Sequence, residues 1–335
     1  MSTQQGINYR RELQKLCIEH RSRLVQHDPK FDARRSNQRL REGLVEAGVT
    51  IPTPSTTRQS TSVSELDERG DGFTEKKHLI NHQWQAVEII GKGGFGIVYR
   101  GQGKNESVAL KINLKGNSEA VLKHESEMIR ELQGIIGVPR LHWYGKTRYV
   151  NLQRGCLVIE LFGRSLNTIK IDTPSKDYLY GFGREMIEIL QRIHERGIVH
   201  RDIKPSNFVT HGDRLVLIDY GLAMAYNKKQ EHPKFAGTYK YAPIAAHKKI
   251  SQMPKDDLES VVYTLMSMAK IELPWGEIPK HRRPEICGLK EGLKIEELTK
   301  DYPALTEIYQ IIRNLSVDDV VPYEKLLERL PSSNK

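Results

Sequence analysis

HRDIKPSNF, at residues 200–208, is the most informative stretch of this sequence, and LIDYGLA follows it at residues 217–223. Polar residues of this density between short apolar runs indicate a chemical role rather than a plain turn. Transfer of a phosphoryl group needs a carboxylate that orients the attacking hydroxyl and accepts its proton, a cation near the phosphate, and oxygen ligands for Mg²⁺. The two stretches contain residues of all three kinds: Asp202, Lys204, Asn207 and Asp219. His194 and His200 lack a metal-ligand spacing such as HExxH, so we expect them to be hydrogen-bonded core residues.

A glycine-rich segment, GKGGFG at residues 91–96, lies about a hundred residues earlier. Without side chains, its backbone N–H groups could approach phosphate oxygens closely. In a dinucleotide-binding site this motif opens a helix, but the β-branched and aromatic residues at 97–99 favour a strand. The segment is therefore either a hairpin that covers a nucleotide, with Phe95 at its tip, or an ordinary glycine-rich turn.

The next motif is VALKI at residues 108–112, which alternates like a strand and places Lys111 on the same side as Ala109. If that side faces a nucleotide, the ammonium can pair with phosphates and the small alanine leaves room for a base; a surface lysine on an edge strand is the alternative. In the helix predicted to follow, Glu125 lies on the apolar face and Glu127 does not. A carboxylate on an apolar face is costly unless it is paired, so we expect Glu125 to bind Lys111.

Composition indicates a folded protein of about two compact units, since the chain has 335 residues, 38% of them hydrophobic. The 52 Lys and Arg exceed the 42 Asp and Glu by +10, but both signs are abundant, which excludes a polycation. The longest uncharged apolar run, residues 260–269, is too short for a membrane span, and no secretory signal is visible at the start. Three widely separated cysteines indicate reduced thiols and a cytoplasmic or nuclear location.

Three regions are expected along the chain. Residues 1–49 form a basic, helical extension, with ten Lys and Arg against four Asp and Glu up to residue 41. Residues 50–79 form a disordered linker rich in Ser, Thr and Pro, whose hydroxyls either accept phosphate or are merely solvated. The folded domain covers residues 80–331. Basic charge alone, without a recognition motif, does not make the extension a nucleic-acid-binding region.

The motifs GxGxxGxV, VALK, HRDxKxxN and DYG, in this order, resemble those of eukaryotic protein kinases. HRDIKPSNF, DYGLA, GTYKYAPIAAHKK at 237–249 and DDLES at 256–260 resemble the casein kinase I superfamily, nearest its tau-tubulin kinase-like branch. The resemblance implies an α+β bilobal protein kinase fold. The N-lobe, residues 80–160, would be a small, mostly antiparallel β-sheet with one helix, and the C-lobe, residues 163–331, larger and mainly α-helical.

The resemblance also implies ATP and Mg²⁺ as cofactors and assigns site residues. By this resemblance Asp202 is the catalytic base, with Lys204 beside it, and Lys111 and Glu125 form the activating ion pair. Asn207 and Asp219 would be the metal ligands, and Asp257 would support the catalytic loop. Nucleotide contacts are implied for Ile90, Gly91, Lys92, Gly93, Gly94, Phe95, Gly96, Ile97, Val98, Ala109, Lys111, Glu160 and Phe162. Ile159 would guard the back of the adenine pocket, and Leu161 would belong to the hinge.

Two positions depart from the general kinase pattern. Ile244 replaces the Glu of Ala-Pro-Glu, which usually anchors the activation segment by an ion pair and which the casein kinase I superfamily also lacks. Tyr220 replaces the Phe of DFG, at little cost if its hydroxyl finds a partner. Between Gly221 and Tyr241 there is no Ser, and Thr238 is the only Thr. We therefore expect an enzyme that is active without phosphorylation of this segment.

The expected activity is a serine/threonine protein kinase, since Lys204 stands where such kinases place a lysine. The resemblance puts an anion-binding site near the substrate groove, which would favour acidic or phosphorylated substrates; a solvated basic surface is the alternative. Its residues are Lys240, Lys280, Arg282 and Arg283. A pseudokinase scaffold is a second candidate function, although no catalytic residue is missing. The expected partners are protein substrates and a nucleotide, with no nucleic acid and no membrane, and the chain is expected to be a monomer.

Overall fold

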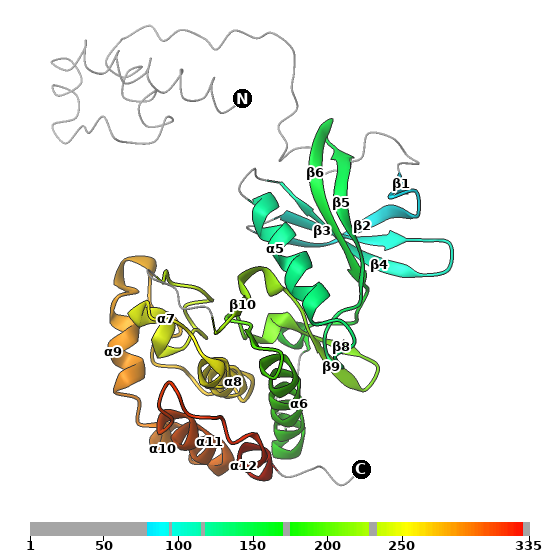
Figure 1. Ribbon diagram of the computed structural model, residues 1–335. Helices are drawn as coiled ribbons and strands as arrows, with labels where there is room; N and C mark the ends of the chain where they lie inside the picture. Colours follow the sequence, from blue (N-terminus) through cyan, green and yellow to red (C-terminus); the bar gives the residue numbers. More distant parts are fainter. Residues whose placement is uncertain (1–78, 94–95, 115–117, 170–174, 228–232, 331–335) are drawn as a thin grey trace, which may run out of the picture. The chain divides into compact units, whose positions relative to one another are not determined.

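The computed structural model describes residues 79–93, 96–114, 118–169, 175–227 and 233–330 (Figure 1). The expected extension (1–49), all but the last residue of the expected linker (50–79), and Gly94 and Phe95 lie outside these residues. The predictions made for them stay predictions.

Six strands form one antiparallel sheet in the order β1-β2-β3-β4-β6-β5. Helix α5 (Ser118–Glu131) follows β4 in the chain and packs on β4, β5 and β6 (Figure 1). The strands are β1 (Leu79–Ile80), β2 (Trp84–Gly93), β3 (Gly96–Gln102), β4 (Ser107–Asn113), β5 (Leu141–Tyr149) and β6 (Leu152–Glu160). The predicted N-lobe, an antiparallel sheet with one helix among its described residues, is therefore confirmed.

The sheet has two packed faces, and β4 shows how the sequence divides between them. Val108, Leu110 and Ile112 are fully buried in a cluster on one face. Ala109 belongs to the other cluster, which continues into the C-lobe. Because side chains alternate along a strand, Lys111 lies on the side of Ala109, as predicted.

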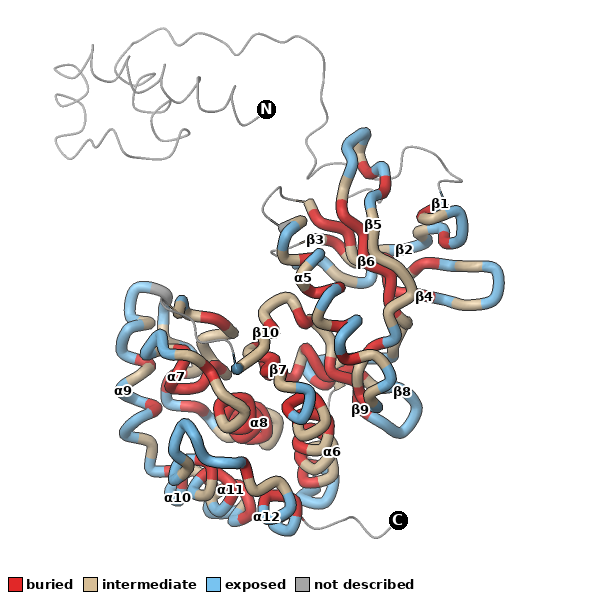
Figure 2. Tube along the Cα trace, in the orientation of Figure 1, coloured by how far each residue is buried: buried red, intermediate tan, exposed pale blue. Residues whose placement is uncertain are grey.

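The second lobe is built around α8 (Pro254–Met268), whose residues 256–266 are all buried (Figure 2). A helix that is buried on every side needs apolar residues around its whole circumference, which explains the uncharged run from residue 260 onward. It begins at Pro254, since a first helical position does not need the N–H that proline lacks. Helix α6 (Lys176–His194) packs beside α8 and starts after Ser175, whose hydroxyl accepts the Tyr178 N–H.

The remaining C-lobe elements are short. The helices are α7 (Ile244–Lys248), α9 (Glu285–Glu291), α10 (Ile295–Leu298), α11 (Pro303–Arg313) and α12 (Tyr323–Glu328). Two strand pairs, β7 (Ile198–Val199) with β10 (Met224–Ala225) and β8 (Phe208–His211) with β9 (Arg214–Leu217), flank the motif loops. The 3₁₀ turns are η1 (Leu166–Thr168), η2 (Pro205–Asn207), η3 (Tyr220–Leu222) and η4 (Lys280–Arg282).

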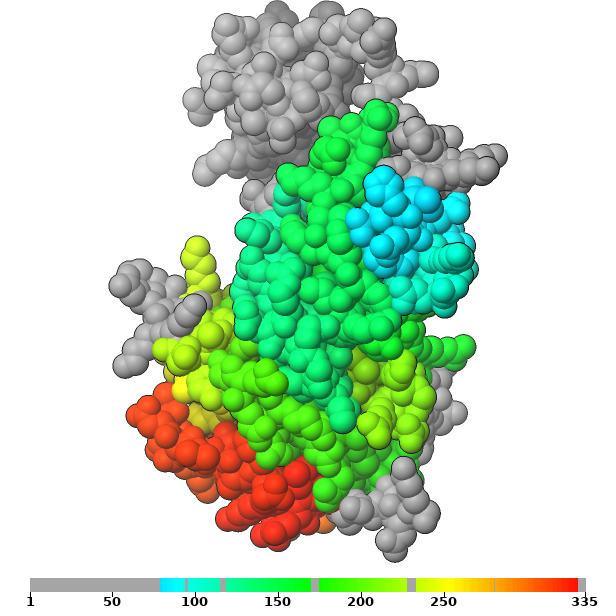
Figure 3. All heavy atoms as spheres, turned by 45° about the vertical axis from the view of Figure 1, so that its right-hand side comes forward, coloured from blue at the N-terminus to red at the C-terminus, as the bar shows by residue number. Residues whose placement is uncertain are grey.

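The two lobes share a core: one apolar cluster runs from the inner face of the sheet and α5 into α6 and α8. In the space-filling view the N-lobe, cyan to green, stacks on the green-to-red C-lobe (Figure 3). The chain thus has the predicted α+β bilobal kinase fold. None of the helices in the described ranges is long and apolar enough to cross a membrane.

Candidate active site

Lys111 pairs with two carboxylates from distant parts of the chain. Its Nζ lies 2.7 Å from Glu125 Oε2 and 2.8 Å from Asp219 Oδ1. The lysine comes from β4, Glu125 from α5, and Asp219 from the turn after β9. The pairing with Glu125 is the one predicted from the helix face; the pairing with Asp219 was not predicted, since nothing local links residues 108 positions apart.

The three charges shift one another's pKa. Burial lowers the pKa of Lys111, but the two carboxylates outweigh it and raise the pKa above its ordinary value. Burial raises the pKa of Glu125 to about 7, against the attraction of Lys111. For Asp219 burial acts in the same direction, but Lys111 prevails and the pKa is lowered. Asp219 therefore stays ionised, as a metal ligand must be.

The loop at residues 200–208 gathers a second network around Asp202, which is 7% exposed. Lys204 Nζ lies 2.6 Å from Asp202 Oδ2. The Thr238 hydroxyl donates to Asp202 Oδ1 at 2.8 Å and accepts from Lys204 Nζ at 3.1 Å. Thr238 thus packs against the catalytic loop. A carboxylate and a cation stand side by side, the pair that phosphoryl transfer needs.

Asn207 and Asp219 suit a magnesium ion. The Asn207 amide nitrogen donates to the Asp202 backbone oxygen at 2.8 Å, which leaves the amide oxygen for a metal. Asp219 uses Oδ1 for Lys111, which leaves Oδ2. Mg²⁺ prefers such hard oxygen ligands and completes its shell with phosphates and water. Within the described ranges no group of three or more His, Cys, Asp or Glu offers a different metal site.

Asp257, near the start of α8, holds the catalytic loop by its backbone. Its carboxylate accepts the N–H groups of His200 and Arg201 at 2.7 and 2.8 Å, and lies 2.9 Å from His194 Nε2. Arg201 has a φ of +68°, an unusual value for a non-glycine residue, and the hydrogen bond from its N–H to Asp257 stabilises this backbone conformation. The support that the resemblance assigned to Asp257 is thus present.

His200 has the buried, structural role that we predicted. The ring is fully buried, and burial lowers its pKa. The Asp202 N–H donates to Nδ1 at 3.3 Å, and Nε2 lies 3.1 Å from the Ile218 carbonyl, to which it donates as a neutral ring. The same ring meets Tyr220 edge-on at 4.9 Å.

From the sequence we expected Tyr220 to replace the usual Phe at little cost if its hydroxyl found a hydrogen-bond partner, and this condition is not met. Its ring is fully buried, and within the described part of the chain its hydroxyl has no hydrogen-bond partner. The oxygen therefore carries a desolvation penalty that the usual phenylalanine would avoid.

The glycine-rich segment is a β-hairpin, as its flanking residues predicted, since β2 and β3 pair from Gln85 to Gly93. Val98 pairs with Lys111 on the inner side of the sheet. Ile97 is a correction: its side chain is buried in the cluster on the opposite face, so it cannot contact a nucleotide on the side of Lys111. Strand alternation is the reason, because adjacent residues point to opposite faces.

The other described residues that we predicted to contact a nucleotide lie on β2, β3, β4 and β6 or directly after β6. Ile159 pairs with Ala109 across β4 and β6, and both are about nine-tenths buried. Glu160 ends β6, and the Phe162 ring lies 5.6 Å from the ring of His211. In β2, Ile90 is half exposed, and a methyl group on Gly91 would make an ordinary contact of 3.7 Å with its nearest neighbour, Val98. Lys92 and Gly93 follow at the end of the same strand.

The predicted anion site is only partly assembled. Arg282 already binds Glu285, at 2.6 Å. The Arg283 guanidinium lies over the Tyr239 ring at 4.0 Å. Lys240 Nζ lies 5.7 Å from the centre of the Tyr241 ring, and the Lys280 side chain is outside the described part. Lys240 and Arg283 are therefore the cations of this set without a carboxylate partner among the described residues.

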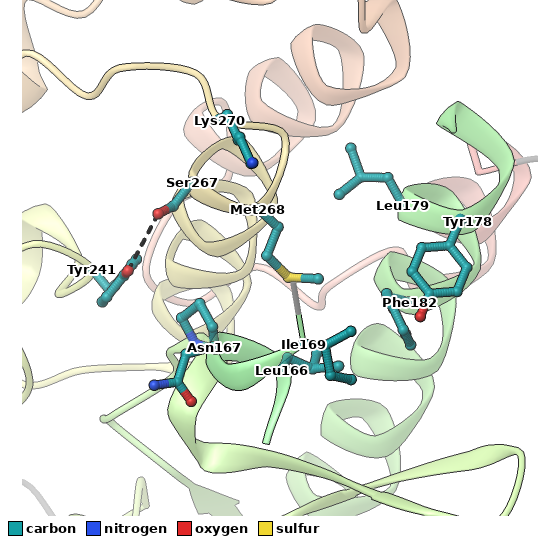
Figure 4. A pocket seen from close by; sticks show the side chains of 11 residues that line it. Leu166, Asn167, Ile169, Tyr178, Leu179, Phe182, Tyr241, Ser267, Met268 and Lys270 are labelled. Atoms are coloured by element: carbon teal, nitrogen blue, oxygen red, sulfur yellow. Dashed lines mark hydrogen bonds between the residues drawn. The ribbon is translucent and has the colours of Figure 1, made fainter. Parts of the chain in front are cut away.

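A pocket of about 240 Å³ lies beside the catalytic loop at residues 200–208, between η1, α6 and the end of α8 (Figure 4). Pro205 and Tyr241 belong to its wall, and Tyr241 and Ser267 are hydrogen-bonded at 3.3 Å. None of Lys111, Asp202 and Asp219 lines it, so it is distinct from the catalytic network. No sequence pattern marks it, because its residues come from separate segments.

The comparisons with known proteins agree with this geometry. The protein kinase domain family matches residues 84–328. A probable casein kinase I homolog of Encephalitozoon cuniculi is 34% identical over 262 residues, which cover 72% of this chain and 85% of that relative. The chain belongs to the protein kinase family and is an ATP-dependent protein kinase of the casein kinase I type.

Proposed function

We propose that the enzyme transfers the γ-phosphate of ATP to serine or threonine hydroxyls of proteins, with Asp202 as the base. The observation that carries this is the network in which Asp202 contacts both Lys204 and Thr238. The hydroxyl proton passes to the Asp202 carboxylate, the hydroxyl oxygen bonds to the γ-phosphorus, and the bond to the β-phosphate oxygen breaks, releasing ADP. Lys204 offsets the charge of the transferred group, and Lys111 that of the other phosphates.

Asn207 and Asp219 are proposed to hold Mg²⁺, which would neutralise phosphate charge when bound. Glu125 and Asp219 both contact Lys111, so the ammonium is held in place before a nucleotide arrives. Asp257 keeps the catalytic loop in shape through two backbone N–H groups.

Replacement of Asp202 tests this role. Asp202→Asn is expected to lower kcat by about 10²- to 10⁴-fold, the usual contribution of a general base, and to leave ATP binding within about twofold. Transfer of labelled γ-phosphate to protein and equilibrium binding of Mg²⁺-ATP are the two measurements. Asp301→Asn, an exposed site far along the chain, is the control. Wild-type enzyme that binds Mg²⁺-ATP without transferring phosphate would instead support a pseudokinase.

We also propose that no upstream phosphorylation is needed. Thr238 is engaged with Asp202 and Lys204 at once, so its hydroxyl is part of the catalytic network rather than a free phosphate acceptor. Enzyme made in bacteria without kinases and then treated with phosphatase should retain full activity. Inactive enzyme that recovers only after incubation with another kinase would contradict the proposal.

A preference for acidic or phosphorylated substrates is a further proposal, supported by Lys240 and Arg283. Both contact aromatic rings, and neither has a carboxylate partner in the described ranges. Arg283→Ala should raise the KM of a peptide with phosphoserine three residues upstream by about tenfold, since one ion pair is lost. Arg282→Ala is the matched control, because Glu285 already neutralises Arg282. Equal wild-type rates on the peptide with and without phosphoserine would refute the preference.

Three other expectations remain proposals that sequence features alone support. They are a place nearest the tau-tubulin kinase-like branch, a monomeric state, and a cytoplasmic or nuclear location. Sedimentation of the purified chain and imaging of a tagged chain in cells would test the last two.

A further inference from the structure

Ala242, Pro243 and Ile244 stand where most kinases have Ala-Pro-Glu, so the anchoring carboxylate is missing from this segment. The structure holds these residues from two sides instead. The Ala242 carbonyl accepts a hydrogen bond from Lys290 Nζ at 2.5 Å, and the Ile244 N–H donates to Glu259 Oε1 at 3.0 Å. Proline has no N–H, so these two groups flank a residue that cannot itself donate.

Lys290, on α9, is fully buried, and its ammonium is surrounded by acceptors. Nζ donates to the Tyr239 carbonyl at 3.1 Å and lies 3.4 Å from the Lys240 carbonyl. The rings of Tyr263 and Trp275 have their centres 4.7 and 5.0 Å from Nζ. An ammonium has three N–H donors and is attracted to aromatic faces, so this cage matches both its donors and its charge.

Glu259, on α8, supplies the opposite charge and is 4% exposed. Its Oε1 accepts from the Tyr263 hydroxyl at 2.7 Å as well as from Ile244. Burial lowers the pKa of Lys290 to about 7, while Glu259 raises it. Tyr263 links the two groups, since its ring faces Lys290 Nζ and its hydroxyl donates to Glu259 Oε1. Through it, Lys290 and Glu259 belong to one buried polar cluster that joins α8, α9 and the segment before α7.

The segment held in this way reaches the catalytic loop through Thr238. The N–H groups of Tyr241 and Ala242 donate to the Thr238 carbonyl at 2.8 and 2.7 Å. The Thr238 hydroxyl then contacts Asp202 Oδ1 and Lys204 Nζ. A shift of Ala242 would therefore move Thr238 with it. Because the Thr238 hydroxyl contacts the Asp202 carboxylate, such a shift would also change the orientation of that carboxylate.

We propose that Lys290 and Glu259 are positioning residues for phosphoryl transfer, which fix the turn around Pro243 and, through Thr238, orient Asp202. The proposal rests on the proposed function of Asp202. Two core groups from outside the segment take the place of the missing glutamate. Their loss should lower kcat and leave nucleotide binding unchanged, because no contact joins them to Lys111 within the described residues.

The first test replaces Lys290 by Met in the full chain, which fills a similar volume but donates no hydrogen bond. For a serine peptide, kcat is expected to fall about tenfold or more, while the KM for ATP changes less than about twofold. Lys248→Met is the matched control: it removes an exposed cation that binds Glu291 between α7 and α9, and should leave both constants unchanged.

A double-mutant cycle with Thr238→Ala separates positioning from a general loss of stability. If Lys290 acts through Thr238, Lys290→Met lowers kcat by less than about threefold once Thr238 is alanine. An equal fall in both backgrounds would overturn the proposal. So would a kcat within about twofold of wild type for a folded Lys290→Met protein.

Glu259→Gln is the second variant, in case Lys290→Met does not fold. Its neutral amide oxygen can still accept the Ile244 N–H but more weakly than the carboxylate, so the turn around Pro243 is held less firmly. We expect kcat to fall about three- to tenfold, again with little further effect when Thr238 is alanine; an unchanged kcat would overturn the proposal. Inactive wild-type enzyme would contradict the proposed function, whereas active wild type with equally active variants contradicts only this inference.

Discussion

Glu125 and Glu127 are two positions apart on α5 and have opposite environments. Glu125 is 1% exposed and bound to Lys111, whereas the Glu127 side chain is 46% exposed and lies 3.7 Å from Lys123. The helical period separates their faces. At the scale of single residues, the surroundings and not the residue type make one of two glutamates part of the site.

This pair offers a matched test of the activating ion pair. Glu125→Gln is expected to lower kcat/KM for ATP by about tenfold or more, because Lys111 loses one of its two anions in a buried setting. Glu127→Gln should leave kcat/KM unchanged, since an exposed pair contributes little. Steady-state kinetics at varied ATP measures both; equal losses for the two variants would argue against a specific role for Glu125.

The hydroxyl of Tyr220, which has no partner among the described residues, leads to a stability prediction. Tyr220→Phe should raise the free energy of unfolding by about 1 kcal/mol and the midpoint by about 2–4 °C, because it removes a buried oxygen that makes no hydrogen bond there. Tyr99→Phe is the control with the opposite expectation, since the Tyr99 hydroxyl is bonded to that of Tyr149 at 2.9 Å. Thermal unfolding of both variants decides; a lower midpoint for Tyr220→Phe would mean that its hydroxyl has a partner.

At the scale of elements, two glycines of the β2–β3 hairpin, Gly93 and Gly96, differ in how much space a side chain would have. A methyl group on Gly96 would lie 2.0 Å from the Ile112 backbone oxygen, whereas one on Gly93 would meet nothing within 4 Å. Gly96 is therefore required for the close approach of β3 to β4, independently of any contact with phosphate.

Alanine substitutions test whether a methyl group is tolerated at each of the two glycines. Gly96→Ala should destabilise the kinase by about 2 kcal/mol or more, because the backbone of β4 cannot yield as a flexible side chain would. Gly93→Ala should leave the unfolding midpoint within about 2 °C. Denaturant unfolding measures the free energies and thermal unfolding the midpoints; similar values for the two variants would show that the strands adjust to the added methyl.

The start of α8 and the catalytic loop are joined by Asp257, which makes stability depend on pH. Burial raises the pKa of this carboxyl, but the hydrogen bond from His194 and its other donors prevail, and the pKa is lowered. Stability from such a group is fully present above the unfolded pKa of about 4 and is lost as the pH falls through the lower pKa of the folded state.

Asp257→Asn should therefore cost roughly 3 kcal/mol at pH 7 and less below about pH 4. Unfolding free energies of wild type and variant, measured from pH 7 down to pH 3, should converge on the acid side. Asp301→Asn, at an exposed position, should follow wild type throughout. A difference that stays constant over this range would indicate that the charge of Asp257 does not matter.

At the scale of the whole molecule, the chain divides into two units, residues 1–72 and 73–335. The kinase lobes belong to the second unit and share one apolar cluster. Deletion of residues 1–72 is expected to change the unfolding midpoint by less than about 2 °C and kcat by less than about twofold, since a unit with its own core folds alone. A large fall in kcat would instead assign the basic extension a part in catalysis.

The sequence alone determined the fold class and the protein kinase chemistry, through a set of motifs in an order that resembles protein kinases. Local rules added the positions of two side chains: alternation in β4 placed Lys111 on the side of Ala109, and the helical period placed Glu125 on the apolar face of α5. Ile97 was the exception, because membership of a motif does not say which face of the strand a side chain takes.

Only the tertiary structure decided the contacts between segments distant in the chain. How the lobes and helices pack decides that Asp219 contacts Lys111 and that Thr238 contacts Asp202. It also decides the contacts of Lys290 and Glu259 around Pro243. The same holds for the Tyr220 hydroxyl, which finds no partner in the described part of the domain. Burial and hydrogen bonding across long separations follow from the packing of the whole domain, which no local periodicity records.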